Sequence, residues 1–242
     1  MTTSESIEEF CSYIEDQVLA IGRVTLAPLP ENTGIGSEFG YRKVLYLTAL
    51  DTLAGLRFHR NAYPQLARRN RERFTRFIKE HASWNVCEYV SLPFLKEQLE
   101  DMKLADRPLH RHVSAKLAEF STEDGGTVYV SSMDESVSEL LSHVTTEKEE
   151  EEALYENQHL SLLYRYRNSL VHESNQPGNG MEVFADNGEP YYHGYIGDTK
   201  WYLVYPVGMF QSLLERSISS FRTYLVDNSV DPYSLVEDKS RW

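Results

Sequence analysis

Side chains suited to phosphate chemistry gather in residues 164–173, which read YRYRNSLVHE. A histidine titrates near neutral pH and an arginine stays charged, so Arg167 and His172 together suit acid–base chemistry on a phosphate. At about 100° per residue, Asn168 and Arg165 would each share a helix face with His172. A structural interpretation is equally open, because cationic side chains near a helix C-terminus favour its dipole and bind its last carbonyls.

Apolar residues before this motif predict one long helix that ends at His172. Together with His159 they approximate the spacing of three and four of a helix with one buried face, and they comprise Leu154, Leu162, Leu163, Tyr166 and Leu170. Residues 174–180, SNQPGNG, must stop the helix. Residues 147–152 hold five acids and one lysine, and we interpret them as the exposed first turns of the same helix, where acids complement the dipole.

Beyond the motif, the apolar pattern changes from helical to alternating. Aromatic and β-branched residues predict strands over 181–185, 191–196 and 201–205. Asn187 followed by Gly188 is a hairpin signal. We therefore predict a small β insertion over 176–205, a hairpin or three strands, placed before a last core helix.

The remaining chain predicts a mainly α fold. Amphipathic or apolar spacing predicts helices over 4–20, 41–56 and 64–82, one after Ser91 and one from Pro206. Ser6 and Glu9 predict a capping box for the first helix. Residues 41–56 are apolar almost all round, which predicts a largely buried helix, and a short strand is expected at 127–130. With an irregular tail over 227–242, the length fits a single domain over 1–242.

Asp51 is the one acid in the apolar helix predicted over 41–56. It is either a partly exposed aspartate near the helix end or a buried carboxylate paired with an arginine, because an unpaired buried charge is very costly. In the second case Asp51 supports the site.

The formal net charge of −13 argues against broad, non-specific binding of nucleic acid, which is driven by phosphate neutralisation. Residues 57–79 are the exception, with eight Lys or Arg against one acid, Glu72. Such segregation is typical either of a solvated helix face or of an electrostatic footprint for RNA. The candidate RNA-binding residues are Arg68, Arg69, Arg71, Arg73 and Arg76.

Few other features suggest chemistry. Cys11 and Cys87 resemble buried small apolar residues rather than a disulfide or zinc framework. His110 and His112 lack carboxylate or cysteine partners, so we expect no metal and no cofactor. The acidic start MTTSESIEEF has no apolar signal core and no run is long enough to span a bilayer, so a cytoplasmic protein with no membrane partner is expected.

The arrangement of a long helix ending in this motif, a variable insertion and one further helix resembles the HEPN superfamily. Its signature is an arginine, four to six residues and a histidine. The matching residues are Arg167, Asn168 and His172, and Arg165 also fits the spacing. Two other pairs share the spacing, Arg76 with His81 and Arg107 with His112, but they lack the polar second residue and the place before the final helix.

The resemblance implies a helical bundle, often a dimer, with metal-independent endoribonuclease activity and a toxin or phage-defence role. His172 would be the general acid or base, Arg167 would stabilise the phosphate, Asn168 would orient either group, and Arg165 would be a second clamp. The implied partners are single-stranded or loop RNA, a second copy of the chain, and an antitoxin or regulatory protein. The alternatives are a non-catalytic module of the same architecture that binds a nucleotide, nucleic acid or protein, and an unrelated helical interaction protein.

Overall fold

The computed structural model describes residues 2–26, 38–145, 148–173 and 177–236. They form ten α-helices and two small antiparallel sheets, which confirms the mainly α class with a small β element. The HEPN-like arrangement of these helices stays a prediction. Within the described residues, no helix is both long and apolar enough to cross a bilayer.

The chain divides into two compact units, each built from separate segments. Unit 1 comprises Met1–Trp84, Leu170–Asn175 and Phe210–Trp242, and unit 2 comprises Asn85–Ser169 and Gln176–Met209. Because the chain passes from one unit to the other inside two helices, the units are not consecutive domains. The single domain over 1–242 stays a prediction.

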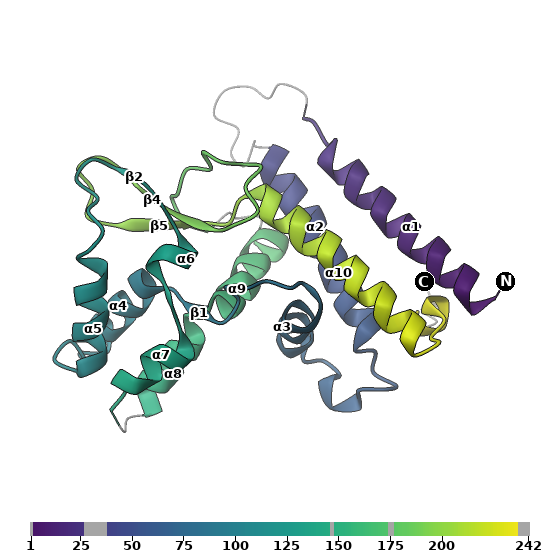
Figure 1. Cartoon of the computed structure of the whole chain (residues 1–242), viewed down its shortest axis with the longest axis horizontal. Coiled ribbons are helices and arrows are strands. Elements are labelled where there is room, and N and C mark those ends of the chain that lie inside the picture. Colours follow the sequence, from purple (N-terminus) through teal and green to yellow (C-terminus); the bar gives the residue numbers. More distant parts are fainter. Residues whose placement is uncertain (1, 27–37, 146–147, 174–176, 237–242) are drawn as a thin grey trace. The chain divides into compact units, whose positions relative to one another are not determined.

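Unit 1 is built from long amphipathic helices. These are α1 (Thr3–Gly22), α2 (Glu38–Arg57), α3 (Asn70–His81) and α10 (Val207–Asp227), with 3-10 turns η1 (Pro64–Leu66) and η3 (Pro232–Leu235). Figure 1 shows α1 and α10 running along each other, and the ring of Phe10 in α1 meets Tyr233 of η3 edge to face. The predicted apolar stripes are buried, including Phe74 and Phe77 of α3 and Ile218 and Phe221 of α10.

Three details of unit 1 differ from the prediction. The capping box uses Thr2 and Glu5, because α1 begins at Thr3 and Ser6 is buried inside the helix. Helix α2 is not buried all round, since Tyr41 and Leu45 are exposed. The predicted irregular tail contains η3, and residues 237–242 lie outside the described residues, as do residues 27–37.

Unit 2 combines shorter helices around its own apolar core. They are α4 (Leu92–Asp101), α5 (Pro108–Leu117), α6 (Val130–Met133), α7 (Val137–Leu140), α8 (Lys148–Glu156) and α9 (His159–His172), with the 3-10 turn η2 (Leu141–His143). Leu95, Leu99, Leu109 and Leu140 are fully buried in this core. Ser91 caps α4 and Pro93 occupies its first turn, as the sequence predicts.

The long helix predicted to end at His172 is two helices, α8 and α9. At the break, Asn157 accepts a backbone hydrogen bond from Ser91, and the N–H of Leu160 donates to Cys87. These bonds to a neighbouring extended segment replace the helical ones, which sequence periodicity does not reveal. The acidic start of α8 is also not wholly exposed, since Glu150 is buried and accepts a hydrogen bond from the Thr145 N–H.

The main sheet of unit 2 has the order β2, β4, β5, with β2 at Gly126–Tyr129, β4 at Tyr191–Gly194 and β5 at Trp201–Val204. A second pair joins β1 (Tyr89–Val90) to β3 (Glu135–Ser136). The strand predicted over 181–185 is absent from the described residues. There, the N–H groups of Val183 and Phe184 donate to the Tyr191 hydroxyl instead of a ladder partner, and β2 supplies the third strand.

Candidate functional site

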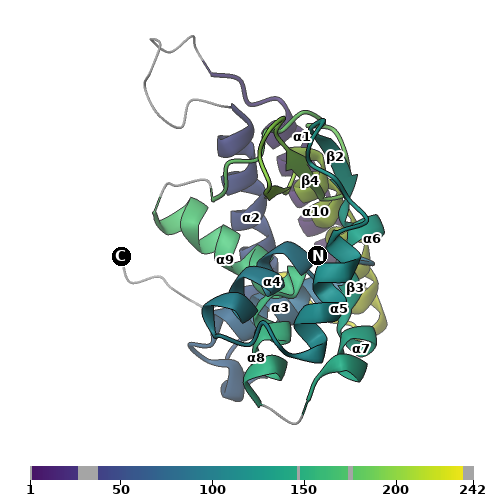
Figure 2. The same ribbon diagram turned by 90° about the vertical axis from the view of Figure 1, so that its left-hand side faces the viewer.

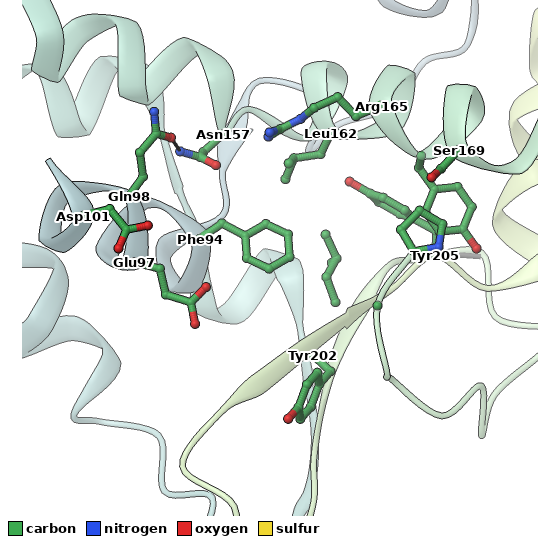
Figure 3. A pocket seen from close by; sticks show the side chains of 14 residues that line it. Phe94, Glu97, Gln98, Asp101, Asn157, Leu162, Arg165, Ser169, Tyr202 and Tyr205 are labelled. Atoms are coloured by element: carbon green, nitrogen blue, oxygen red, sulfur yellow. Dashed lines mark hydrogen bonds between the residues drawn. The ribbon is translucent and has the colours of Figure 1, made fainter. Parts of the chain in front are cut away.

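A cavity of about 520 Å³ opens in unit 2. Two helices supply most of its wall. Its lining residues are Phe94, Glu97, Gln98 and Asp101 of α4, Leu162, Arg165, Tyr166 and Ser169 of α9, Asn157, Pro177, Gly178, Tyr202, Leu203 and Tyr205. Figure 2 shows α4 and α9 in the turned view, and Figure 3 shows the cavity from close by. This volume is in the range of small-molecule sites, roughly 300–1,000 Å³.

The same spacing explains both helical walls. The lining residues of α4 and those of α9 each fall at positions i, i+3, i+4 and i+7, which is one face of a helix. In α9 this face alternates with the residues that pack into the core, such as Leu163 and Leu170, both buried. The cavity is therefore lined by one face of each of the two amphipathic helices, next to the face that packs into the core.

Arg165 is the arginine of the motif that reaches the cavity. Its side chain is exposed, and its Nη2 donates to the carbonyl of Glu156 at 2.8 Å, which anchors one edge of the guanidinium. Figure 3 shows the guanidinium extending over the cavity beside Asn157. An arginine has five N–H donors, so a guanidinium held in this way still presents donors to an anion.

Arg167, two residues further along α9, has a different environment. It is buried, with 7% of its surface exposed, and its Nη1 donates to Asn168 Oδ1 at 2.9 Å. Its guanidinium lies over the ring of Tyr164 at 6.0 Å. His172 is exposed at the end of α9. Neither Arg167 nor His172 is among the described residues that line the cavity, so their catalytic roles stay predictions.

Carboxylates lie at the α4 side of the cavity. Glu97 forms an ion pair with Lys200 at 2.9 Å, between the Oε1 and Nζ atoms. Asp101 is exposed, and Figure 3 shows its carboxylate directed towards the cavity. The wall thus combines one guanidinium, aromatic rings and one carboxylate whose charge is not balanced by an ion pair among the described residues.

A buried network of polar side chains lies next to the cavity wall and includes the wall residue Tyr205. His159 Nε2 lies 2.7 Å from Asp134 Oδ2, and both side chains are fully buried. The Tyr192 hydroxyl donates to the same carboxylate oxygen at 2.7 Å, and the N–H of Leu92 donates to Asp134 Oδ1 at 3.0 Å. Every charged group in this network therefore has hydrogen-bonding partners, as burial requires.

The network fixes the tautomer of His159 and the position of Tyr205. An ionised carboxylate can only accept, so His159 Nε2 carries the proton and Nδ1 accepts from the Tyr205 hydroxyl at 3.0 Å. Burial raises the pKa of Tyr205, the Asp134 charge raises it further, and Arg165 opposes the increase. Tyr205 therefore stays a neutral phenol, and the network holds its ring in the cavity wall.

Unit 1 contains a second buried histidine, whose charged neighbour is an arginine rather than a carboxylate. Arg57 Nε donates to His81 Nε2 at 3.2 Å, and His81 Nδ1 lies 2.9 Å from Ser220 Oγ. Burial lowers the pKa of His81 to about 4, with a further decrease from the Arg57 charge. His81 is therefore neutral at physiological pH and serves the packing of unit 1.

The other candidate residues all lie in unit 1. Of the five arginines predicted to bind RNA, Arg68, Arg69, Arg71 and Arg76 are exposed and Arg73 is half-buried. Arg69 pairs with Glu72 and Arg76 with Glu80, which neutralises part of the basic face. Asp51 is half-buried in α2. The RNA-binding role of the arginines and the supporting role of Asp51 stay predictions.

Several residues of the site escaped sequence reasoning. Asp134, His159 and Tyr205 come from distant segments, and only the fold brings them together. The repeated i, i+3, i+4, i+7 pattern of Phe94 to Asp101 was the one available signal, because it places a second face on α4. Among the described residues, no group of three or more His, Cys, Asp or Glu side chains is arranged to hold a metal ion.

Comparisons of the chain with protein-family models, with curated proteins and with solved structures found no match in any of the three.

Proposed function

We propose that this chain binds a nucleotide in the unit 2 cavity, either free or as an unpaired nucleotide of RNA. The observation that carries the proposal is the exposed guanidinium of Arg165 beside a wall of aromatic rings. A guanidinium pairs with phosphate through several parallel hydrogen bonds. Aromatic rings stack on bases, and amide or carboxylate oxygens accept hydrogen bonds from base edges.

The test is the affinity for nucleoside monophosphates and for short unstructured RNA, measured by calorimetry. Arg165→Ala removes the phosphate contact and should weaken binding at least about tenfold, the loss of one charge-assisted hydrogen bond. Arg111→Ala is the matched control, because Arg111 is an exposed arginine of unit 2 outside the cavity wall. Arg167→Ala should instead lower the stability of the fold.

A free nucleotide and an unpaired nucleotide of RNA share this chemistry. The affinities for monophosphates and for RNA distinguish between them. Tight binding of monophosphates with no gain from RNA indicates a free nucleotide. Stronger binding of RNA indicates an unpaired nucleotide within a strand. If the wild-type protein binds neither, the proposal is wrong.

Metal-independent RNA cleavage is the second candidate. His172 is exposed, and at about 100° per residue it lies within about 20° of Arg165 around the continuous helix α9. In this scheme His172 is the general base or acid on the 2′-hydroxyl or leaving oxygen, and Arg165 or Arg167 stabilises the phosphate. A second copy of the chain supplies a further acid or base, so the active form is a homodimer.

Cleavage of unstructured RNA in the presence of EDTA tests the second candidate. We expect His172→Ala to abolish cleavage while nucleotide binding and thermal stability are retained. Light scattering measures the accompanying dimer. A protein that binds nucleotides but leaves all RNA intact excludes the nuclease and retains the binding function. In the nuclease case, a neutralising protein partner would fit a toxin or phage-defence role.

A further inference from the structure

The α4 side of the cavity offers hydrogen-bond acceptors and almost no donors. The Gln98 amide is used on both sides, since its Nε2 donates to Glu156 and its Oε1 accepts from Asn157 Nδ2. Glu97 is held by Lys200. Asp101 is left, among the described residues, as a carboxylate that an incoming group can reach.

We propose that this cavity selects guanine over the other bases, an inference that rests on the proposed nucleotide-binding function. An ionised carboxylate is an acceptor with two oxygens side by side. The Watson–Crick edge of guanine presents two adjacent donors, N1–H and the N2 amino group. The corresponding edges of adenine, cytosine and uracil each place an acceptor next to the donor. Asp101 therefore matches guanine with two parallel hydrogen bonds.

The remaining walls agree with this orientation. Phe94 lies on the same face of α4 as Asp101 and presents a ring for stacking, while Arg165 comes from α9. Figure 3 shows Asp101 and Glu97 on the α4 side of the cavity, the Phe94 ring near its centre, and the Arg165 guanidinium on the α9 side. A nucleotide placed with its phosphate on Arg165 thus directs its base towards α4. Adenine in this position would turn the lone pair of its N1 towards the carboxylate, which is unfavourable.

Calorimetry with GMP, IMP, AMP and XMP tests the inference. We expect GMP to bind at least tenfold more tightly than AMP, with IMP between them because it keeps N1–H and lacks the amino group. Asp101→Asn replaces one acceptor with a donor. This variant should weaken GMP binding about tenfold and improve XMP binding, since xanthine carries a carbonyl where guanine has the amino group.

Asp124→Asn is the matched control and should keep the preference for GMP, because Asp124 is an exposed aspartate of unit 2 outside the cavity wall. Asp101 is exposed, so both variants should keep the thermal stability of the wild type. Equal binding of AMP and GMP by the wild type overturns guanine selection and leaves the proposed function intact. Binding of no nucleotide overturns both. An unchanged preference for GMP in Asp101→Asn, or its loss in Asp124→Asn, overturns the assignment to Asp101.

Discussion

The two buried histidines of this protein have opposite electrostatic neighbours. His159 in unit 2 donates to the carboxylate of Asp134, whereas His81 in unit 1 accepts from the guanidinium of Arg57. In each ring, the role of Nε2 in its hydrogen bond is set by a partner that can only accept or only donate. The difference lies in what the second nitrogen does, because His159 holds a tyrosine of the cavity wall while His81 only meets Ser220.

The comparison separates two histidines that pack inside the protein from one that is exposed. His159 is completely buried and His81 nearly so, while His172 is exposed at the end of α9. Two of these three histidines belong to the sequence pairs considered for chemistry, yet only His172 is accessible. Spacing from an arginine alone therefore does not distinguish a packed imidazole from an exposed one.

The largest expected effect on stability comes from removing the buried carboxylate of Asp134 in unit 2. Asp134→Ala leaves the N–H groups of His159 and Leu92 without this acceptor, while the Tyr192 hydroxyl keeps Ser91 Oγ, and should lower the free energy of unfolding by about 2–5 kcal/mol. Urea denaturation measures this loss. In the double variant Asp134→Ala, His159→Leu, the loss in the free energy of unfolding should be smaller than the sum of the losses in the two single variants. A loss below about 1 kcal/mol in Asp134→Ala would contradict the role of the network.

The next effect is a pH dependence in unit 1. The pKa of His81 is about 4 in the folded state and near 6.5 when unfolded, so between these values the unfolded state binds more protons. The stabilisation is complete above pH 6.5 and is lost as the pH falls towards 4, by roughly 1–3 kcal/mol.

Urea denaturation at several pH values measures this loss, and the comparison is with His81→Gln, which keeps a polar side chain that can donate and accept hydrogen bonds but cannot titrate. Carboxylates titrate in the same range in both proteins. The informative quantity is therefore the difference between the wild type and the variant in the slope of the free energy of unfolding against pH. Identical slopes would show that His81 is not responsible.

A smaller effect compares one tyrosine hydroxyl from each network. Tyr205→Phe leaves His159 Nδ1 without its buried donor and should lower the free energy of unfolding by about 1–2 kcal/mol. Tyr63→Phe removes only an acceptor for Arg57 Nη1 at a half-buried site and should cost less than about 1 kcal/mol. Thermal denaturation of both variants measures the difference, and the reverse order would contradict the deeper burial of the unit 2 network.

The smallest expected effect is that of Ser220→Ala. This change removes the side-chain acceptor of the His81 Nδ1 proton and should lower the free energy of unfolding by about 0.5–1 kcal/mol. It should also leave the pH dependence of His81 in place, because Arg57 and burial are unchanged. Loss of that dependence would assign it to Ser220 instead.

The helices were predictable wherever a local signal existed. Ser91 and Pro93 mark the start of α4, and the stripe of α10 follows the helical period. The break between α8 and α9 was not predictable, because it depends on backbone bonds from Asn157 and Leu160 to an extended segment far upstream. The pairing of β2 with β4 was missed for the same reason, since the two strands are distant in the sequence.

The candidate site was predictable only in part. The sequence singled out Arg165 as a second clamp, and Arg165 is the arginine that reaches the cavity. Sequence spacing did not reveal that Arg167 would be buried beside Asn168, because the two arginines differ by about 200° around the helix and only the packing decides which side faces the core. Asp101 and Tyr205 became visible only when two helices and a strand enclosed a common space.

The interruption at Asn157 and Gln158 has a consequence for how this chain tolerates change. The hydrogen bond from the Leu160 N–H to the Cys87 carbonyl fixes the start of α9. The rotation of α9 about its own axis therefore does not depend on that of α8. Residues added to or deleted from the glutamate-rich stretch upstream should leave the rotation of Arg165 about the axis of α9 unchanged. The two helices can therefore vary in length independently.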